Sequence, residues 1–168
     1  MRQWILCAGL LAAPAVPCFA QQADLAPYAN DPRLSSLDDF FQGARCPIRR
    51  LAGEFLHAAD RNGLDWRLLP TLALVESGCG KHARGNNIFG WDSGRKKYAS
   101  VREAIHAVAS RISHSKLYRG KNLDQILATY NPHPRYARLV KSVMRKVGPE
   151  APPVTALAAQ AEPIPPLL

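Results

Sequence analysis

The chain has 168 residues, which is room for one globular domain with tails and excludes an assembly of several ordinary domains. It carries 22 Lys and Arg residues against 13 Asp and Glu residues, and its formal net charge is +9 at pH 7. This charge favours an anionic partner. Charge alone does not distinguish a nucleic acid from an anionic extracellular polymer such as the bacterial wall.

Residues 1–20 have the pattern of a secretory signal peptide. Arg2 gives a short basic start, residues 4–16 are almost wholly apolar, and the segment ends in Ala20 with small residues at the usual spacing. The apolar run is too short, and too interrupted by proline, to span a membrane comfortably. We therefore expect cleavage before Gln21 and a periplasmic or secreted monomer without stable membrane insertion, for which a wall polymer is a better partner than nucleic acid.

The first helical patterns follow a loose segment. Residues 21–35 are expected to be a flexible leader, and Ser36 is expected to cap a short helical turn. A first clear helix is predicted over 47–62, because proline starts it, an apolar stripe follows one face and glycine ends it. A second helix is predicted over 66–77.

The next segment lacks a helical period. Residues 79–99 contain four glycines, so we expect a loop with a short β-hairpin around 87–91. Ser100 and Glu103 then form a capping-box pattern, which predicts the start of a helix. Three helical stripes follow, over 101–112, 123–130 and 134–147.

The pattern indicates one mainly α-helical domain over residues 36–148. Beyond it, residues 149–168 are rich in Pro, Ala and Leu, and we expect them to be a disordered tail.

Cleavage of the signal peptide would leave two cysteines, Cys46 and Cys79. Two cysteines in an oxidising compartment suggest one disulfide. Cys46 precedes one predicted helix and Cys79 follows the next, and these ends should meet because short-linked consecutive helices pack antiparallel. The alternative is two free buried thiols.

Glu76 is a carboxylate in an apolar setting. It ends the run Leu68–Val75, and in a helix over 66–77 both Leu72 and Ala73 lie on its own face. Desolvation by this surface and the negative end of the helix dipole both favour the protonated form. A neutral acid is what general acid catalysis of glycosidic cleavage requires. The alternative is a surface glutamate at a helix end.

The loop after this helix contains residue types that suit sugars. Asn87, Phe89 and Trp91 offer an amide and two aromatic rings, which match the acetamido groups and the flat apolar faces of sugar rings. Alternatively, Phe89 anchors the loop in the core and the asparagine fills a turn position. Asp92, the only carboxylate of the loop, is either a second catalytic group or a turn former.

Tyr130 and Asn131 close the helix over 123–130. Tyr130 can project from the helix end, and a buried tyrosine hydroxyl needs a hydrogen-bond partner. Glu76 is a candidate for that partner, and Asn131 is a candidate for holding sugars.

Three segments carry a family resemblance, namely Leu69–Gly80, Asn86–Gly90 and Tyr130-Asn131-Pro132. In this order they resemble the glucosaminidase domain of bacterial peptidoglycan hydrolases, within the lysozyme-like superfamily, and the resemblance covers about residues 45–148. It implies a single lysozyme-like helical domain with a small loop or β-hairpin lobe. It also implies that Glu76 is the general acid, that Tyr130 lies near the scissile bond and that the loop over 87–91 lines the glycan cleft.

We therefore expect an exported endo-β-N-acetylglucosaminidase that acts on peptidoglycan glycan strands. We find no confident second carboxylate of the kind that a two-carboxylate glycosidase uses. Three routes stay open: attack by the substrate's own 2-acetamido group, attack by a neighbouring sugar hydroxyl with an anhydro product, or attack by water that Asp92 activates. A lytic transglycosylase or muramidase of the same fold, and a non-catalytic glycan-binding protein, are the alternatives.

No metal or cofactor site is expected. His57, His106 and His114 fall on predicted helices without a matching partner, and no spacing resembles a zinc site.

Overall fold

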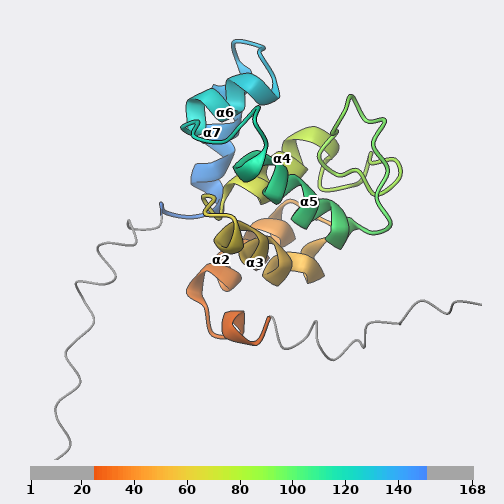
Figure 1. The fold of residues 1–168 in the computed structure, drawn as a ribbon. Coiled ribbons are helices and arrows are strands. Elements are labelled where there is room, and N and C mark those ends of the chain that lie inside the picture. Colours follow the sequence, from red (N-terminus) through yellow and green to blue (C-terminus); the bar gives the residue numbers. More distant parts are fainter. Residues whose placement is uncertain (1–24, 151–168) are drawn as a thin grey trace, which may run out of the picture.

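The computed structural model describes residues 25–150, so the predicted signal peptide and most of the predicted tail lie outside the described residues. Within that range the chain forms helices and loops and contains no β-strand (Figure 1). The predicted mainly α-helical class is confirmed, whereas the predicted hairpin around 87–91 is wrong.

Six α-helices are present in the described range, and none of them is long and apolar enough to cross a membrane. The α-helices are α2 (Pro32–Gly43), α3 (Ala52–Arg61), α4 (Leu68–Ser77), α5 (Val101–His114), α6 (Leu123–Tyr130) and α7 (Tyr136–Val147), with two 3-10 turns, η1 (Ala26–Tyr28) and η2 (Arg49–Leu51).

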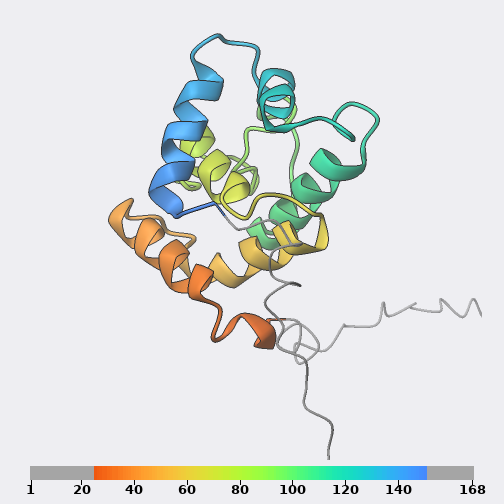
Figure 2. The same ribbon diagram turned by 90° about the vertical axis from the view of Figure 1, so that its left-hand side faces the viewer.

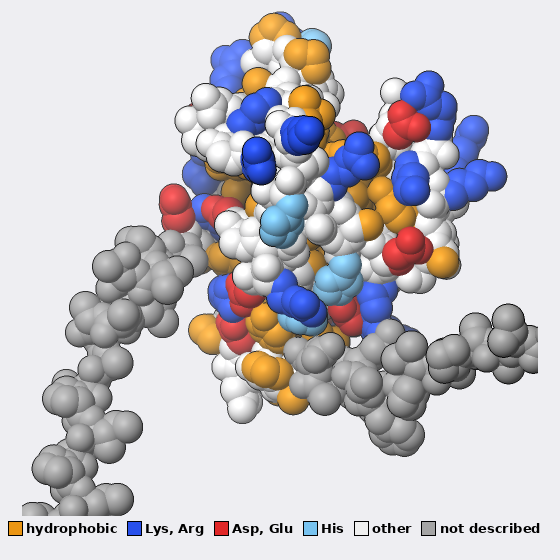
Figure 3. Space-filling model, viewed as in Figure 1, with side chains coloured by type: hydrophobic (Ala, Val, Ile, Leu, Met, Phe, Trp, Pro, Cys, Tyr) orange, Lys and Arg blue, Asp and Glu red, His pale blue; other side chains and the backbone are white. Residues whose placement is uncertain are grey.

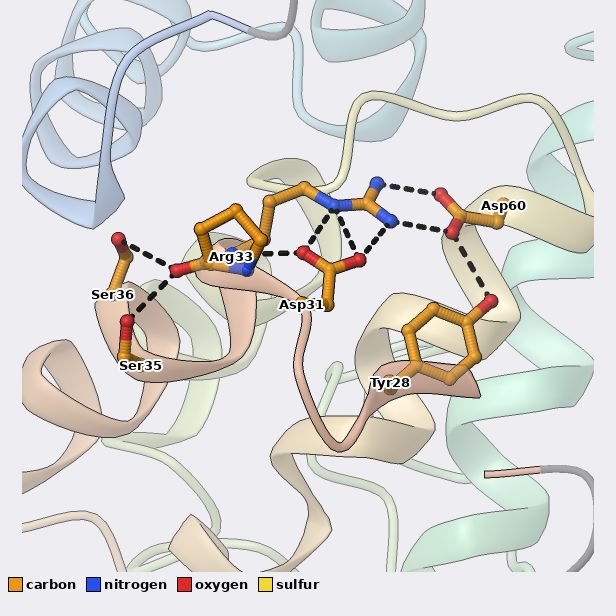
Figure 4. A network of polar contacts seen from close by, with 7 residues as sticks. Tyr28, Asp31, Arg33, Ser35, Ser36 and Asp60 are labelled. Carbon is orange, nitrogen blue, oxygen red and sulfur yellow. Dashed lines mark hydrogen bonds and ion pairs between the residues drawn. The ribbon is translucent and has the colours of Figure 1, made fainter. Parts of the chain in front are cut away.

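Helix α2 begins about one turn earlier than the sequence predicts, within the segment expected to be a flexible leader. Asp31 accepts the backbone N–H of Arg33 at 2.8 Å and so caps the helix. The Arg33 guanidinium also bridges Asp31 at 2.7 Å and Asp60 of α3 at 2.8 Å (Figure 4). Ser36, expected to be the cap, lies inside α2 instead. The start of α2 is therefore tied to α3.

The core forms around α3 and α4. Helix α3 contacts α2, α4 and α5, while α4 also packs against α7. Helix α7 in turn contacts α6 and α2 (Figure 2). The apolar surface of α4 is buried almost throughout, and Leu68, Leu69 and Leu72 are at most 1% exposed. This arrangement brings α7 alongside the helix that carries Glu76.

A disulfide joins Cys46 and Cys79, as predicted, with 5.2 Å between their Cα atoms. Cys46 lies just before η2 and α3, and Cys79 lies just after α4. Gly78 ends α4 with φ of +60°, a left-handed conformation in which glycine carries no Cβ penalty. The disulfide therefore ties the C-terminal end of α4 to the start of α3.

Candidate functional site

Glu76 lies in the last turn of α4 with its side chain half-buried. Its Oε1 accepts a hydrogen bond from the Tyr136 hydroxyl at 2.5 Å. Burial raises the pKa of Glu76, and this effect outweighs the hydrogen bond from Tyr136, which stabilises the charged form and lowers the pKa. The net direction agrees with the expectation from the apolar residues that precede Glu76.

The phenol that contacts Glu76 is Tyr136, and not Tyr130 as we expected. The Tyr130 hydroxyl donates instead to the backbone carbonyl of Phe89 at 2.5 Å. The Tyr130 and Tyr136 rings stack in parallel, with 6.1 Å between centroids and 5° between planes. Tyr130 therefore supports the tyrosine that contacts the acid. Tyr136 belongs to the apolar stripe predicted over 134–147. This pattern could have indicated a buried hydroxyl that needs a hydrogen-bond partner.

Gly90 brings the loop close to the carboxylate. Its φ is +61°, and a Cβ added there would lie 3.2 Å from Glu76 Oε2. Any side chain at this position would meet the acid and would also occupy an unfavourable backbone region. Glycine therefore allows this approach without backbone strain and without displacing the carboxylate.

The asparagine of the loop organises its backbone. Asn87 is 3% exposed. Its Nδ2 donates to the Trp91 carbonyl and its Oδ1 accepts the Trp91 N–H, both at 2.9 Å. These side-chain bonds close the loop in place of a strand ladder, which is why no hairpin forms. The Asn87 amide thus positions Trp91, and its hydrogen bonds to the backbone occupy both of its polar atoms.

Three other residues that we expected to bind substrate instead contact other residues of the protein. Phe89 is fully buried in the core, in edge contact with Phe55. Asn131 accepts the His133 N–H at 3.0 Å and so shapes the turn after α6. Asp92 is exposed, pairs with Arg95 at 2.7 Å and has φ of +53°. The hydrogen bond from Arg95 lowers the pKa of Asp92, so this carboxylate is ionised.

A cavity of about 560 Å³ begins at Gly90, the loop residue that adjoins Glu76. Its walls come from the loop between Gly90 and Tyr98, from Arg111 of α5, from Tyr118 and from Tyr130 at the end of α6. Figure 3 shows the surface hollowed between the α6–α7 part and the loop after α4, with apolar side chains inside and Lys and Arg at the rim. Glu76 itself does not line this cavity, but Gly90 contributes to the wall and also adjoins the acid.

Aromatic rings dominate one side of this cavity. The Trp91 ring lies 5.6 Å from the Tyr130 ring, edge to face, and 5.9 Å from the Tyr118 ring, measured between centroids. The Arg111 guanidinium lies over Trp91, 5.7 Å from its centroid. The cavity thus offers flat apolar surfaces with cationic groups beside them.

Two histidines that we expected to lack partners meet between α3 and α5. His57 and His106 lie with Glu54, each offering one potential ligand atom within 4.8 Å of the others. Both carboxylate oxygens of the buried Glu54 are already used, one by Arg102 Nε at 2.7 Å and one by His106 Nε2 at 2.8 Å. This cluster acts as a polar contact between α3 and α5.

Comparison of the chain with protein-family models, with curated proteins and with solved structures found no match.

Proposed function

We propose that this protein is an exported peptidoglycan hydrolase that cleaves a β-1,4 bond of wall glycan, of the endo-β-N-acetylglucosaminidase type, with Glu76 as its general acid. One observation carries the proposal. A half-buried carboxyl with a raised pKa, held by a tyrosine hydroxyl, adjoins a cavity walled by aromatic rings. The three motif segments that resemble glucosaminidase domains support the same activity.

In the proposed mechanism, neutral Glu76 donates its proton to the glycosidic oxygen as the bond to the sugar carbon breaks. The carboxylate that forms has a donor already in place, because Tyr136 reaches Oε1 at 2.5 Å. Tyr130 holds Tyr136 by ring stacking and is itself fixed by Phe89. Tyr130 is therefore a positioning residue and part of the cavity wall.

The cavity suits sugar rings by its shape and chemistry. Trp91 presents an aromatic face whose direction is set by the Asn87 bonds to its backbone. Sugar rings have flat patches of C–H groups that pack on such faces, while their hydroxyl and acetamido groups bond to nearby polar groups. A glycan seated on Trp91 would pass Gly90, the residue of the cavity wall that adjoins Glu76.

Besides the acid, the mechanism needs a nucleophile that attacks the sugar carbon. A two-carboxylate glycosidase places its second carboxyl roughly 5–9.5 Å from the acid. Asp92 is ionised, as a base must be, but its pairing with Arg95 competes with such a role. The substrate's own acetamido group is therefore the first candidate nucleophile. A neighbouring hydroxyl would instead give an anhydro product, as in a lytic transglycosylase.

Digestion of purified sacculi, followed by mass spectrometry of the products, tests the activity. Reducing N-acetylglucosamine ends support the proposal. Reducing or anhydro N-acetylmuramic ends assign the protein to the muramidase or transglycosylase alternatives. Glu76→Gln should reduce product release by at least about 100-fold, because general acid catalysis contributes that much or more. Asp92→Asn is the matched variant, and a loss of similar size there would identify Asp92 as the second group.

The non-catalytic alternative makes a different prediction for the same samples. A glycan-binding protein would sediment with sacculi and release no fragments, and Glu76→Gln would change neither result. Product release by the unmodified protein that disappears in Glu76→Gln, with sacculus binding retained, excludes this alternative.

A further inference from the structure

The cavity near Glu76 has more cationic groups than carboxylates in its wall, and Asp92 interacts with Arg111 and Lys96 without forming an ion pair with either. Arg111 and Lys96 both line it, and neither forms an ion pair with any carboxylate of residues 25–150. Asp92 is the single acidic side chain in the wall, and it is bonded to Arg95. The cavity surface therefore carries excess positive charge.

Arg111 lies close to an aromatic ring. Its guanidinium is over the Trp91 ring, 5.7 Å from the centroid, and the N–H groups of a guanidinium can still donate to a ligand in this position. The charge of Arg111 also acts on the cavity wall, because it partly offsets the rise that desolvation causes in the pKa of Tyr98 and Tyr118. A planar donor fork beside aromatic surface suits a carboxylate carried by a bound ring.

Lys96 adds a second charge on the same wall. Its Nζ lies 5.8 Å from the centroid of the Tyr98 ring, so the ammonium group is close to aromatic surface as well. Neutral sugars bind through hydrogen-bond donors and acceptors, and they gain little from two cations that have no ion-pair partner. This combination is better explained by a ligand that carries negative charge.

We propose that Arg111 and Lys96 bind a carboxylate of the glycan seated against Trp91, so that the protein selects carboxylate-bearing glycan over neutral glycan. This inference rests on the proposed function for the position of the sugar. In peptidoglycan the carboxylate has two sources. It is either the lactyl group of N-acetylmuramic acid in strands without peptides, or a carboxylate of the stem peptide.

A binding measurement tests the inference without turnover. Glu76→Gln protein is titrated by calorimetry with a disaccharide that contains N-acetylmuramic acid, and with its lactyl methyl ester. We expect the ester to bind at least about tenfold more weakly, since hydrogen bonds to charged groups contribute that much. Arg111→Met should abolish this preference, and Arg111→Lys should retain part of it because the charge remains. Arg119→Met, an exposed arginine outside the cavity wall, is the control and should keep the full preference.

Three substrates separate the two sources. Chito-oligosaccharides carry no carboxylate, strands stripped by an amidase carry the lactyl carboxylate, and intact sacculi carry those of the peptides. Faster cleavage of stripped strands than of intact sacculi assigns the lactyl group, and the reverse order assigns the peptide. Equal binding of acid and ester, together with equal cleavage of all three substrates by the unmodified protein, overturns the inference and leaves the proposed hydrolase intact. A protein that prefers the acid over its ester but cleaves nothing overturns the proposed function alone.

Discussion

The pKa of Glu76 depends on two opposed effects, burial and the hydrogen bond from Tyr136. A general acid must be protonated, so activity should fall as pH rises through this pKa. Tyr136→Phe removes the group that stabilises the charged form, so the pKa should rise and the alkaline limb of the pH–rate profile should move to higher pH. The rate at low pH should fall as well, because the forming carboxylate loses its donor.

Tyr130→Phe is the matched variant for this experiment. Its hydroxyl donates to the Phe89 carbonyl and makes no bond to Glu76, so the alkaline limb should stay where it is. If the alkaline limb of the pH–rate profile moves equally in both variants, ring packing and not the Tyr136 hydroxyl sets the pKa of Glu76.

The raised pKa of Glu76 also predicts how stability depends on pH. The folded state holds the proton more tightly than the unfolded chain, in which the ordinary value is 4.5. The resulting stabilisation is fully present below that value and is lost as pH rises through the folded-state pKa. Glu76→Gln, which stays neutral, should therefore melt at a higher temperature than the unmodified protein near pH 7 and show no such advantage near pH 4. A difference in melting temperature between the two proteins that stays constant from pH 4 to pH 7 would contradict the raised pKa of Glu76.

Gly90 and Gly94 allow backbone and contact effects to be separated. Both have positive φ, +61° and +79°, but only a Cβ at Gly90 would meet Glu76. Alanine at either position should cost about 1–2 kcal/mol of unfolding free energy, the penalty of the left-handed region. Gly90→Ala should in addition reduce glycan cleavage severalfold, whereas Gly94→Ala should not. If Gly90→Ala and Gly94→Ala both fold and cleave glycan equally fast, the Glu76 carboxylate can shift away from the added methyl group without loss of activity.

At the scale of residues, the sequence predicts the raised pKa of Glu76 but not the residue that donates a hydrogen bond to it. The apolar run before Glu76 is local, and it was sufficient to anticipate the direction of the pKa shift. The bond from Tyr136 joins residues 60 positions apart, and whether Tyr130 or Tyr136 reaches Glu76 depends on how α6 and α7 meet. The role of Asn87 was ambiguous for the same reason, because an amide suits both a sugar and a loop backbone.

At the scale of elements, the Cys46–Cys79 disulfide ties the end of α4 to the start of α3. The chain-entropy model gives a stabilisation of roughly 3–4 kcal/mol for the separation of 33 residues. Reduction should therefore lower the urea midpoint of unfolding. A variant with both Cys46→Ala and Cys79→Ala should have the lower midpoint already and should not respond to reductant. If reductant leaves the midpoint of the unmodified protein unchanged, the bond does not contribute to stability.

Helices α5, α6 and α7 were predicted well from their apolar period. The helix predicted over 47–62 is shorter in the structure, because the 3-10 turn η2 precedes α3, which begins at Ala52. Helix α6 has the predicted bounds, and α5 is capped by Ser100, whose Oγ accepts the Glu103 N–H at 3.1 Å. The start of α2 was missed although its signals are local, since Asp31 caps the helix and proline stands at its first position. On α7, Leu139 belongs to the apolar stripe predicted over 134–147 but is 51% exposed, although α2, α4 and α6 all contact this helix.

At the scale of the whole molecule, the net charge of +9 should govern how the protein reaches an anionic wall. Dispersed surface charge mainly increases the association rate and is screened by salt, whereas bonds inside a cavity are screened less. Raising the salt concentration from about 0.1 M to about 1 M shortens the screening length from roughly 10 Å to roughly 3 Å.

Binding of Glu76→Gln protein to intact sacculi should therefore weaken at least about tenfold over this range, mainly through slower association. Binding to neutral chito-oligosaccharides should change little, because apolar and neutral hydrogen-bonded contacts do not depend on screening. Surface plasmon resonance on immobilised wall fragments and on immobilised chito-oligosaccharide measures both rates directly. If affinity falls equally for wall fragments and for chito-oligosaccharide, salt acts on the fold of the protein. Salt-independent binding to wall fragments would mean that the cavity, and not the surface charge, controls capture.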